Sequence, residues 1–391
     1  MKNIFIFVVC GAREHIDTLH FSLPYLQKFS SNEIWVLTDS SRNEVPVIHD
    51  HIIDIKTPAN FDNHQASIYL KTGIYQFVPK GNKYCYLDTD IIAFSKEVDL
   101  IFDAYVSPIT FAPDHCNLPV FSASAVHCSC LKELDAARNQ FENKLNEIDP
   151  LRLSKNQEIQ FYRKKLQTHY LEVKKNPVKF IVTAARYVFS PSIFKLTNEI
   201  QFDKKKRVWK TSAGLEFMAD LKIKKVTKDL GLKWNYLKKE PQLKDGRSIW
   251  RDQCPHLKEL IFEKFQVAVK NPNFQHWNGG VFLFDDNSHA FLSNWFNYTL
   301  EIFKDSAWKT RDQGTLIATV WKFGLENHPT LDKKWNLIAD YHNPYLNWTS
   351  DHKIQLSSSE LIQPNFIHVY HHFQDEEWGF WNQLITHVNQ K

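Results

Sequence analysis

The sequence contains no apolar run long enough to span a membrane, although 43% of its 391 residues are hydrophobic. A membrane-spanning helix needs about 18 or more consecutive apolar residues. The apolar run near the start, residues 4–10, is followed at once by Arg13 and Glu14, without the small residues of a signal-peptide cleavage site. We therefore expect this run to be the first strand of a buried parallel sheet, and the protein to be cytoplasmic.

The six cysteines do not have the spacing of a disulfide framework, and the sequence contains no internal repeat or low-complexity tract. Cys10 and Cys85 lie inside apolar runs, where a thiol behaves as a small hydrophobic side chain. We therefore expect reduced cysteines and an ordinary globular chain.

The first hundred residues alternate between strand-like and helix-like segments. Apolar strand patterns occupy residues 3–9, 33–39, 51–55 and 84–94. Between the last two, Asp62 and Gln65 have the spacing of a capping box, and apolar residues recur behind them at helical intervals. This alternation predicts an α/β fold with a mixed, mostly parallel sheet of the Rossmann-like kind, covered by helices on both faces.

Charge divides the chain more sharply than its net value of +4 indicates. Residues 150–270 hold 28 Lys and Arg against 12 Asp and Glu, whereas the rest of the chain is acidic. We expect residues 1–128 and 271–391 to form one α/β domain, interrupted at 129–270 by a basic, mainly helical insertion.

Asp88 and Asp90 close the strand pattern of residues 84–94. Acidic residues at the carboxyl end of a parallel strand lie in the crevice where open α/β sheets bind ligands. In an extended chain the two carboxylates would share one face and repel each other unless a cation lay between them. A hard divalent ion shared with a diphosphate fits this arrangement, and capping of the next helix is the alternative.

At this point the sequence resembles a known family. Five segments match, in order, the nucleotide-diphospho-sugar transferases of the GT-A fold, especially glycosyltransferase family 8: "YLDTDI" (86–91), "WNGGVFLFD" (277–285), "RDQGTLIATV" (311–320), "KKWNLIAD" (333–340) and "FIHVYHHFQDEEWGFW" (366–381). The insertion lies outside the resemblance, which covers residues 1–110 and 274–385.

The resemblance implies a role for each matching residue. Asp88, Asp90 and His368 would bind Mn²⁺ or Mg²⁺, unless His368 is a core histidine. Asn278, Gly279 and Gly280 would form the loop lining the donor-sugar pocket, and Cys10, Gly11 and Ala12 would face the nucleotide. Asp312 and Gln313 would lie beside the anomeric carbon, with helix capping as the alternative for Asp312. Lys71 would reach a phosphate or donor hydroxyl, or else lie on a solvated helix face.

Three positions depart from the family pattern. Gly314 stands where the family has a second carboxylate, and His371 stands where it has glycine. The family's closing lysine, which helps to hold the diphosphate, has no counterpart in "EEWGFW".

The insertion contains "KNPVKFIVTAARYVFSPSIFKL" (175–196), which mixes basic residues with large apolar ones. Such a segment can lie in an anionic membrane interface, near a lipid-linked acceptor. An anionic polysaccharide acceptor and an ordinary solvated helical face are the other interpretations.

These features together predict a metal-dependent glycosyltransferase. It would move a sugar from a nucleotide sugar, with UDP as the expected nucleotide, to a glycan or glycolipid, with retention of configuration. We expect no nucleic-acid partner, and a position in the cytoplasm or at the inner face of the membrane. A nucleotidyltransferase that makes nucleotide sugars and a non-catalytic polyanion-binding protein are the alternatives.

Overall fold

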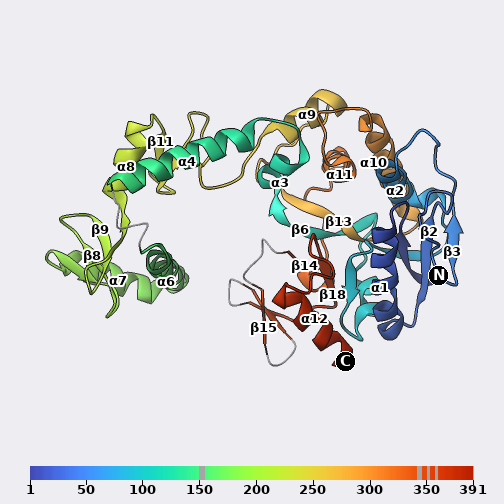
Figure 1. Cartoon of the computed structure of the whole chain (residues 1–391), viewed down its shortest axis with the longest axis horizontal. Coiled ribbons are helices and arrows are strands. Elements are labelled where there is room, and N and C mark those ends of the chain that lie inside the picture. Colours follow the sequence, from blue (N-terminus) through green and yellow to red (C-terminus); the bar gives the residue numbers. More distant parts are fainter. Residues whose placement is uncertain (149–154, 341–345, 350–352, 357–359, 391) are drawn as a thin grey trace. The chain divides into compact units, whose positions relative to one another are not determined.

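The computed structural model describes residues 1–148, 155–340, 346–349, 353–356 and 360–390, which fold into two compact units (Figure 1). Met1–Cys128 and Pro255–Lys391 form the first, which we call the α/β unit, and Ser129–Cys254 form the second, the inserted unit. The inserted unit ends at Cys254 rather than at residue 270, because helix α9 (His256–Phe265) packs within the α/β unit against α3 (Leu118–Ala125).

The α/β unit is built on a six-stranded sheet with the strand order β3-β2-β1-β4-β13-β6. The first four strands are parallel to one another, whereas β13 runs antiparallel to both of its neighbours. The strands are β1 (Asn3–Val8), β2 (Glu33–Thr38), β3 (Ile52–Asp54), β4 (Lys83–Leu87), β6 (Ile109–Asn117) and β13 (Gln275–Phe284). The predicted α/β fold with a mixed, mostly parallel sheet is confirmed.

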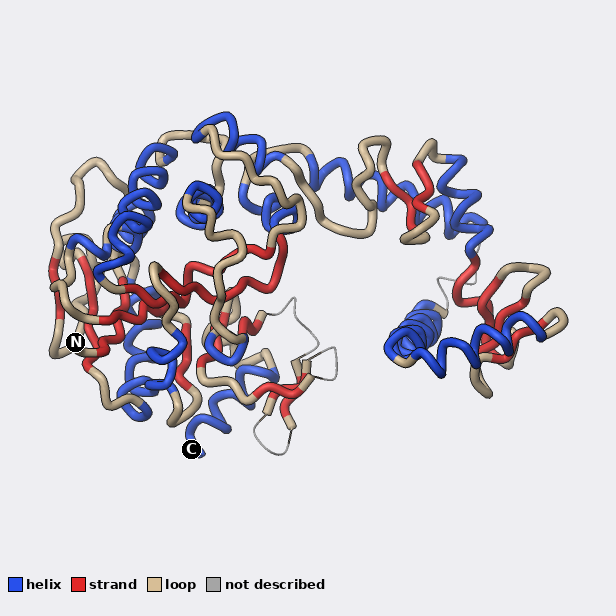
Figure 2. The backbone as a smooth tube through the Cα atoms, turned by 180° about the vertical axis from the view of Figure 1, so that it is seen from behind, coloured by secondary structure: helices blue, strands red, loops and turns tan. Residues whose placement is uncertain are grey.

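Helices cover both faces of this sheet (Figure 2). On one face α2 (Asn63–Thr72), α10 (His289–Ile302) and α11 (Arg311–Lys322) contact one another, and on the other α1 (Arg13–Phe29) and α12 (Gly379–Gln390) join the main core. Successive residues of β13 serve the two faces in turn: Phe282 packs on Trp295 of α10, and Leu283 belongs to the main core. The capping box of Asp62 and Gln65 is present at the start of α2.

A second, three-stranded sheet lies next to the first, with the order β14-β18-β5. It consists of β5 (Ile91–Ala93), β14 (Leu337–Ala339) and β18 (Phe366–Val369). The single strand expected over residues 84–94 is therefore two strands in two sheets, because β5 pairs with β18 and not with a neighbour of β4. The remaining elements of the unit are β15 (Asn347–Trp348), β16 (Ile354–Gln355), β17 (Leu361–Ile362), η1 (Ile74–Gln76), η2 (Val98–Ala104), η3 (Asp286–Ser288) and η4 (Lys333–Trp335).

The inserted unit is mainly helical, as predicted, and has two small cores of its own. Its helices are α4 (Cys130–Ile148), α6 (Asn156–Lys175), α7 (Pro177–Phe189) and α8 (Asp220–Asp229). It also contains strands that the sequence does not predict: β7 (Ile193–Lys195), β8 (Ile200–Asp203), β9 (Val208–Thr211) and β10 (Glu216–Ala219) in one sheet, and β11 (Lys233–Asn235) and β12 (Glu240–Gln242) in another. In the described parts of the chain, every helix is too short or too polar to cross a bilayer.

Candidate metal and donor site

Asp88 and Asp90 follow β4 directly, at the edge of the sheet where the parallel strands end. We expected the chain to stay extended there, but it turns at residues 89 and 90. The amide of Ile91 donates to the carbonyl of Asp88 (3.3 Å) across this turn. The turn is required because β5 must leave the first sheet to pair with β18. This turn, and not strand alternation, directs both carboxylates to the same place.

The third predicted ligand, His368, lies beside these carboxylates. The ligand atoms of Asp88, Asp90 and His368 all lie within 4.8 Å of one another, and Nε2 of His368 is 3.2 Å from Oδ1 of Asp90. Burial lowers the pKa of His368, but the Asp90 carboxylate outweighs this effect and raises it. Burial in turn raises the pKa of Asp90, and His368 more than compensates, so the Asp90 carboxylate is favoured. His368 therefore pairs with one of the two predicted metal-binding carboxylates, and its role as a ligand stays a prediction.

Gly280 forms the floor of this cluster. A Cβ atom on Gly280 would lie 2.7 Å from Cε1 of His368 and 2.9 Å from Oδ2 of Asp88, closer than real Cβ contacts come. The glycine is therefore needed so that these two side chains can approach the backbone of β13. Two carboxylates and an imidazole meet here over bare backbone and could hold a divalent cation, and the carboxylate oxygens are the ligands that Mn²⁺ and Mg²⁺ prefer.

Asn278, Gly279 and Gly280 do not form a loop, contrary to expectation; they lie within β13. The register between β13 and β6 shifts between Asn278 and Phe282, so the strand bulges at the two glycines. A bulge next to a functional site redirects backbone and side chains locally. Here it turns Gly280 towards Asp88, whose amide donates to the Gly280 carbonyl (2.9 Å).

A chain of hydrogen-bonded side chains orients His368, and two of its members, Asn336 and Asp114, are not among the site residues predicted from the sequence. Oδ1 of Asn336 lies 3.1 Å from Nδ1 of His368, and Nδ2 of Asn336 donates to Oδ1 of Asn278 (3.0 Å). Asn278 in turn donates to Oδ2 of Asp114 (3.0 Å). Nδ1 of His368 can donate to Asn336, which would leave Nε2, on the side of Asp88 and Asp90, as the ligand atom when a metal ion binds. Asn336 lies within the matched segment 333–340, whereas no pattern in the sequence marks Asp114.

Lys71 is buried, so the alternative of a solvated helix face is wrong. Its Nζ lies 3.2 Å from Oδ1 of Asp88 and 3.2 Å from Oδ2 of Asp312. Burial lowers the pKa of Lys71, but the two carboxylates together raise it well above its ordinary value, which keeps the ammonium charged. Lys71 therefore links Asp88 to the first turn of α11.

Asp312 and Gln313 both reach this site from the start of α11. Asp312 does not cap the helix, whose N-cap is Thr310, and pairs with Lys71 instead. Oε1 of Gln313 accepts from the amide of Gly279 (3.3 Å). Gly314 has a steric reason for its departure from the family pattern: a Cβ there would lie 2.8 Å from Cζ3 of Trp308, so no carboxylate fits.

Cys10, Gly11 and Ala12 follow β1, the neighbour of β4, and so lie at the same edge of the sheet. Burial raises the pKa of the Cys10 thiol to about 11, with a further contribution from Asp39, so this thiol stays protonated. Gly11 has a φ of 100°, a conformation that side-chain-bearing residues rarely adopt. Its amide donates to Oδ1 of Asn43, and its carbonyl accepts from the amide of Glu44, which fixes the turn.

His371 has a φ of 68°, in the left-handed region that glycine adopts without strain. Its Nδ1 lies 3.8 Å from Oδ2 of the buried Asp340. The histidine therefore keeps a backbone conformation suited to the glycine that the resemblance leads us to expect at this position.

His276 is fully buried next to the site, with its ring stacked on Phe121 at a centroid distance of 3.9 Å. Neither ring nitrogen has a hydrogen-bond partner of normal geometry among the described residues, although Gln313 approaches the ring. Burial lowers the pKa of His276 from 6.5 to about 4, against the opposing charge of Asp114. The ring is therefore neutral at physiological pH.

The lowered pKa of His276 predicts that the folded protein is less stable at acidic pH. Because the folded pKa lies below the unfolded value, the unfolded chain binds the proton first, and the free energy of unfolding falls as the pH drops from 6.5 to about 4. We expect His276 to account for roughly 3 kcal/mol of this loss. Urea unfolding of His276→Phe at about pH 7 and about pH 4.5 should show a smaller pH effect than the wild type. His64→Phe, on an exposed position of α2, is the control; equal pH effects in all three proteins would contradict the assignment.

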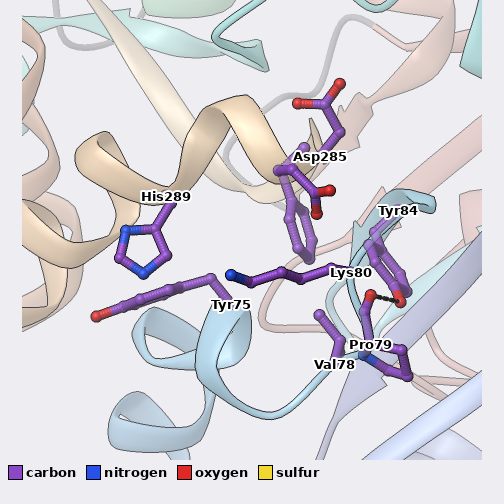
Figure 3. A pocket seen from close by; sticks show the side chains of 9 residues that line it. Tyr75, Val78, Pro79, Lys80, Tyr84, Asp285 and His289 are labelled. Atoms are coloured by element: carbon purple, nitrogen blue, oxygen red, sulfur yellow. Dashed lines mark hydrogen bonds between the residues drawn. The ribbon is translucent and has the colours of Figure 1, made fainter.

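A separate pocket of about 220 Å³, shown in Figure 3, lies at the other ends of β4 and β13, away from the acidic pair. Its lining comes from η1, the segment that leads into β4, the carboxyl end of β13 and the start of α10, and includes Tyr75, Lys80, Tyr84, Asp285 and His289. The Tyr84 hydroxyl donates to the carbonyl of Pro79 (2.6 Å). Because Asp88 lies at the other end of β4, this pocket is not part of the metal and donor site.

Comparison with known proteins gives likenesses of fold only. No protein-family model matches the sequence, and no curated protein matches it. The chain is similar to the apo structure of the bifunctional glycosyltransferase WbbM, with 11% identity and a TM-score of 0.41 over 99% of this chain and 50% of that one. It is also similar to the galactosyltransferase LgtC in complex with donor and acceptor sugar analogues. The identity is 8% and the TM-score 0.42, over 99% of this chain and 95% of that one. With mouse xyloside xylosyltransferase 1 in its apo form, the identity is 9% and the TM-score 0.36, over 95% of this chain and 99% of that one. Likenesses this distant carry no argument about activity, which has to come from the residues.

Proposed function

We propose that this protein is a metal-dependent glycosyltransferase that moves a sugar from a nucleotide sugar, with UDP as the nucleotide, to a glycan or glycolipid. The observation that carries the proposal is the meeting of Asp88, Asp90 and His368 over the bare backbone of Gly280. This cluster lies at the carboxyl edge of an α/β sheet, where such folds bind nucleotides. The five matched sequence segments support the same function.

Asp88, Asp90 and His368 would hold Mn²⁺ or Mg²⁺, and Cys10, Gly11 and Ala12 would face the nucleotide base and ribose. The bound ion would neutralise negative charge on the departing diphosphate. Lys71 holds Asp88 and Asp312 at a fixed separation, and Asp312 and Gln313 present polar groups beside Gly279, where we place the donor sugar. Fixed polar groups of this kind stabilise charge that develops in a transition state.

In the proposed transfer, the bond between the anomeric carbon and the diphosphate oxygen breaks. A new bond forms between that carbon and the acceptor oxygen, and the hydroxyl proton of the acceptor passes to the departing diphosphate. The nucleoside diphosphate and the glycosylated acceptor are the products.

Titration calorimetry with UDP, with and without Mn²⁺, tests the proposal most directly. We expect UDP to bind only when Mn²⁺ is present, and expect a screen of UDP-sugars to show slow hydrolysis of one donor. Pyrophosphate release from UTP and a sugar 1-phosphate would instead identify a nucleotidyltransferase. Binding of polyanions without any metal-dependent UDP binding would favour the non-catalytic alternative, which rests on the basic insertion.

We predict that the transfer retains the configuration of the anomeric carbon. An inverting transfer needs a carboxylate base across the sugar ring, and no matched segment supplies one, whereas Asp312 and Gln313 supply polar groups on the face that a retaining transfer uses. Proton NMR of the product, read from the anomeric coupling constant, decides the question. A β-linked product from an α-linked donor would overturn both the retention and the role of Asp312.

A lipid-linked acceptor would bring the enzyme to an anionic membrane surface. The inserted unit has the charge for such contact, with 28 Lys and Arg against 15 Asp and Glu between residues 129 and 254. Each basic residue near an anionic bilayer strengthens binding by about 1 kcal/mol.

A further inference from the structure

Helix α7 of the inserted unit is almost entirely exposed, although most of its residues are apolar. None of its described side chains is buried, whereas helices of folded proteins normally bury one face. It begins at Pro177, after Asn176 accepts from the amides of Val178 and Lys179, so its start is well defined.

One side of α7 packs on the inserted unit. The ring of Tyr187 contacts Phe194 and Phe202 at centroid distances of 5.4 and 6.1 Å, and Thr183, one turn earlier, is half-buried. This side anchors the helix to the sheet formed by β7 to β10.

The opposite side carries a stripe of large apolar side chains at helical spacing, which we call the α7 stripe. It consists of Val178, Ile181, Val182, Val188 and Phe189, and these residues are between 52% and 85% exposed. Residues three, four, seven and eleven positions apart lie on one face of a helix, so the five form one continuous surface. Apolar surface gathered in this way, rather than scattered, marks an interaction site.

The charges around the stripe are basic. Lys179 and Arg186 flank it along the helix, and α7 itself contains no acidic residue. At its carboxyl end Lys204 donates to the carbonyls of Tyr187 and Ser190, and the exposed Lys205 and Lys206 follow directly. An apolar face bordered by lysine and arginine complements a bilayer with anionic headgroups, where the apolar residues enter the acyl boundary and the basic ones meet the lipid phosphates.

We infer that the α7 stripe docks the protein on an anionic membrane surface, with α7 lying in the plane of the interface. The inference rests on the membrane contact proposed above and names the part of the chain that makes it, but it does not depend on the transfer chemistry.

The test is co-sedimentation of the full chain with vesicles of phosphatidylcholine alone, or of phosphatidylcholine with about one third phosphatidylglycerol. We expect binding to the anionic vesicles that weakens steeply with salt. The double variant Ile181→Ser/Val188→Ser should bind at least roughly tenfold more weakly, because it removes two of the apolar side chains that enter the bilayer. Both residues are exposed, so the fold should not change.

Leu237→Ser is the matched control, because Leu237 is 96% exposed in the same unit but lies in the turn between β11 and β12. Its binding should equal that of the wild type. Lys205→Gln/Lys206→Gln should reduce the preference for anionic over neutral vesicles several-fold.

Three results would overturn the inference: no binding of the wild type to anionic vesicles, equal binding of the Ile181→Ser/Val188→Ser variant, or a wild-type dimer that this variant dissociates. The last result would identify the stripe as a contact between two copies of the chain. Donor hydrolysis without vesicles should be the same in all these variants, because none of the changed residues lies in the candidate site. Vesicle binding therefore tests the membrane inference separately from the proposed transfer. Loss of binding in the Ile181→Ser/Val188→Ser variant supports the inference even if the protein hydrolyses no donor.

Discussion

Replacing Asp90 by asparagine should lower donor turnover by about three orders of magnitude while leaving the fold intact. Asparagine has nearly the same shape, but it removes the negative charge that faces His368 at 3.2 Å and that would face the metal ion. The charge stabilisation that a metal supplies to a leaving group amounts to several kcal/mol, and each 1.4 kcal/mol changes the rate tenfold. Hydrolysis of UDP-sugars, followed by release of UDP, measures the effect.

Asp103→Asn is the matched control for this experiment, because Asp103 is exposed on η2 and does not belong to the cluster. It should behave as the wild type does. Calorimetry should show that Asp90→Asn weakens Mn²⁺ binding, and excess EDTA should abolish turnover of the wild type. Near-normal turnover of Asp90→Asn, or full activity in EDTA, would show that the cluster is not a catalytic metal site.

The second large effect is expected from the addition of one methyl group. Gly280→Ala places a Cβ atom 2.7 Å from His368 and 2.9 Å from Asp88, so at least one of these ligands must move. A displacement of about 1 Å in a catalytic group can lower the rate about a hundredfold. We therefore expect a loss of about this size in turnover, together with weaker binding of Mn²⁺.

Gly379→Ala separates this effect from a general cost of removing a glycine. Gly379 starts α12, and a Cβ atom there would meet nothing within 4 Å. It should leave turnover and the free energy of unfolding nearly unchanged. If Gly280→Ala keeps the wild-type affinity for Mn²⁺, the close approach of the backbone to the ligands has no functional role.

The sequence predicted the first half of the α/β unit well, because its signals are local. Strands β1 and β2 are apolar runs with clear ends, and the capping box of Asp62 and Gln65 depends on residues three positions apart. The short strands of the inserted unit were missed because three or four residues give too little periodic signal.

The candidate site was only partly predictable. Asp88, Asp90, Asp312 and Gln313 could be proposed from the sequence because each lies in a segment whose pattern is recognisable by itself. Asp114 was missed because its importance comes from a hydrogen bond to Asn278, far away in the sequence. The same holds for Asn336, which matters through its contacts with His368 and Asn278.

The sequence by itself therefore determined the fold class, the strand that presents the acidic pair and the basic character of the insertion. These depend on periodicity, on composition and on residues adjacent in the chain. The tertiary structure alone decided that the chain turns at Asp90, that Lys71 is buried between two carboxylates and that an apolar stripe of α7 stays exposed. Each of these follows from which distant segments pack together, because β18 draws β5 away from β4 and the first turn of α11 covers Lys71. Such packing depends on the shape and burial of whole surfaces, which a local pattern of residues does not contain.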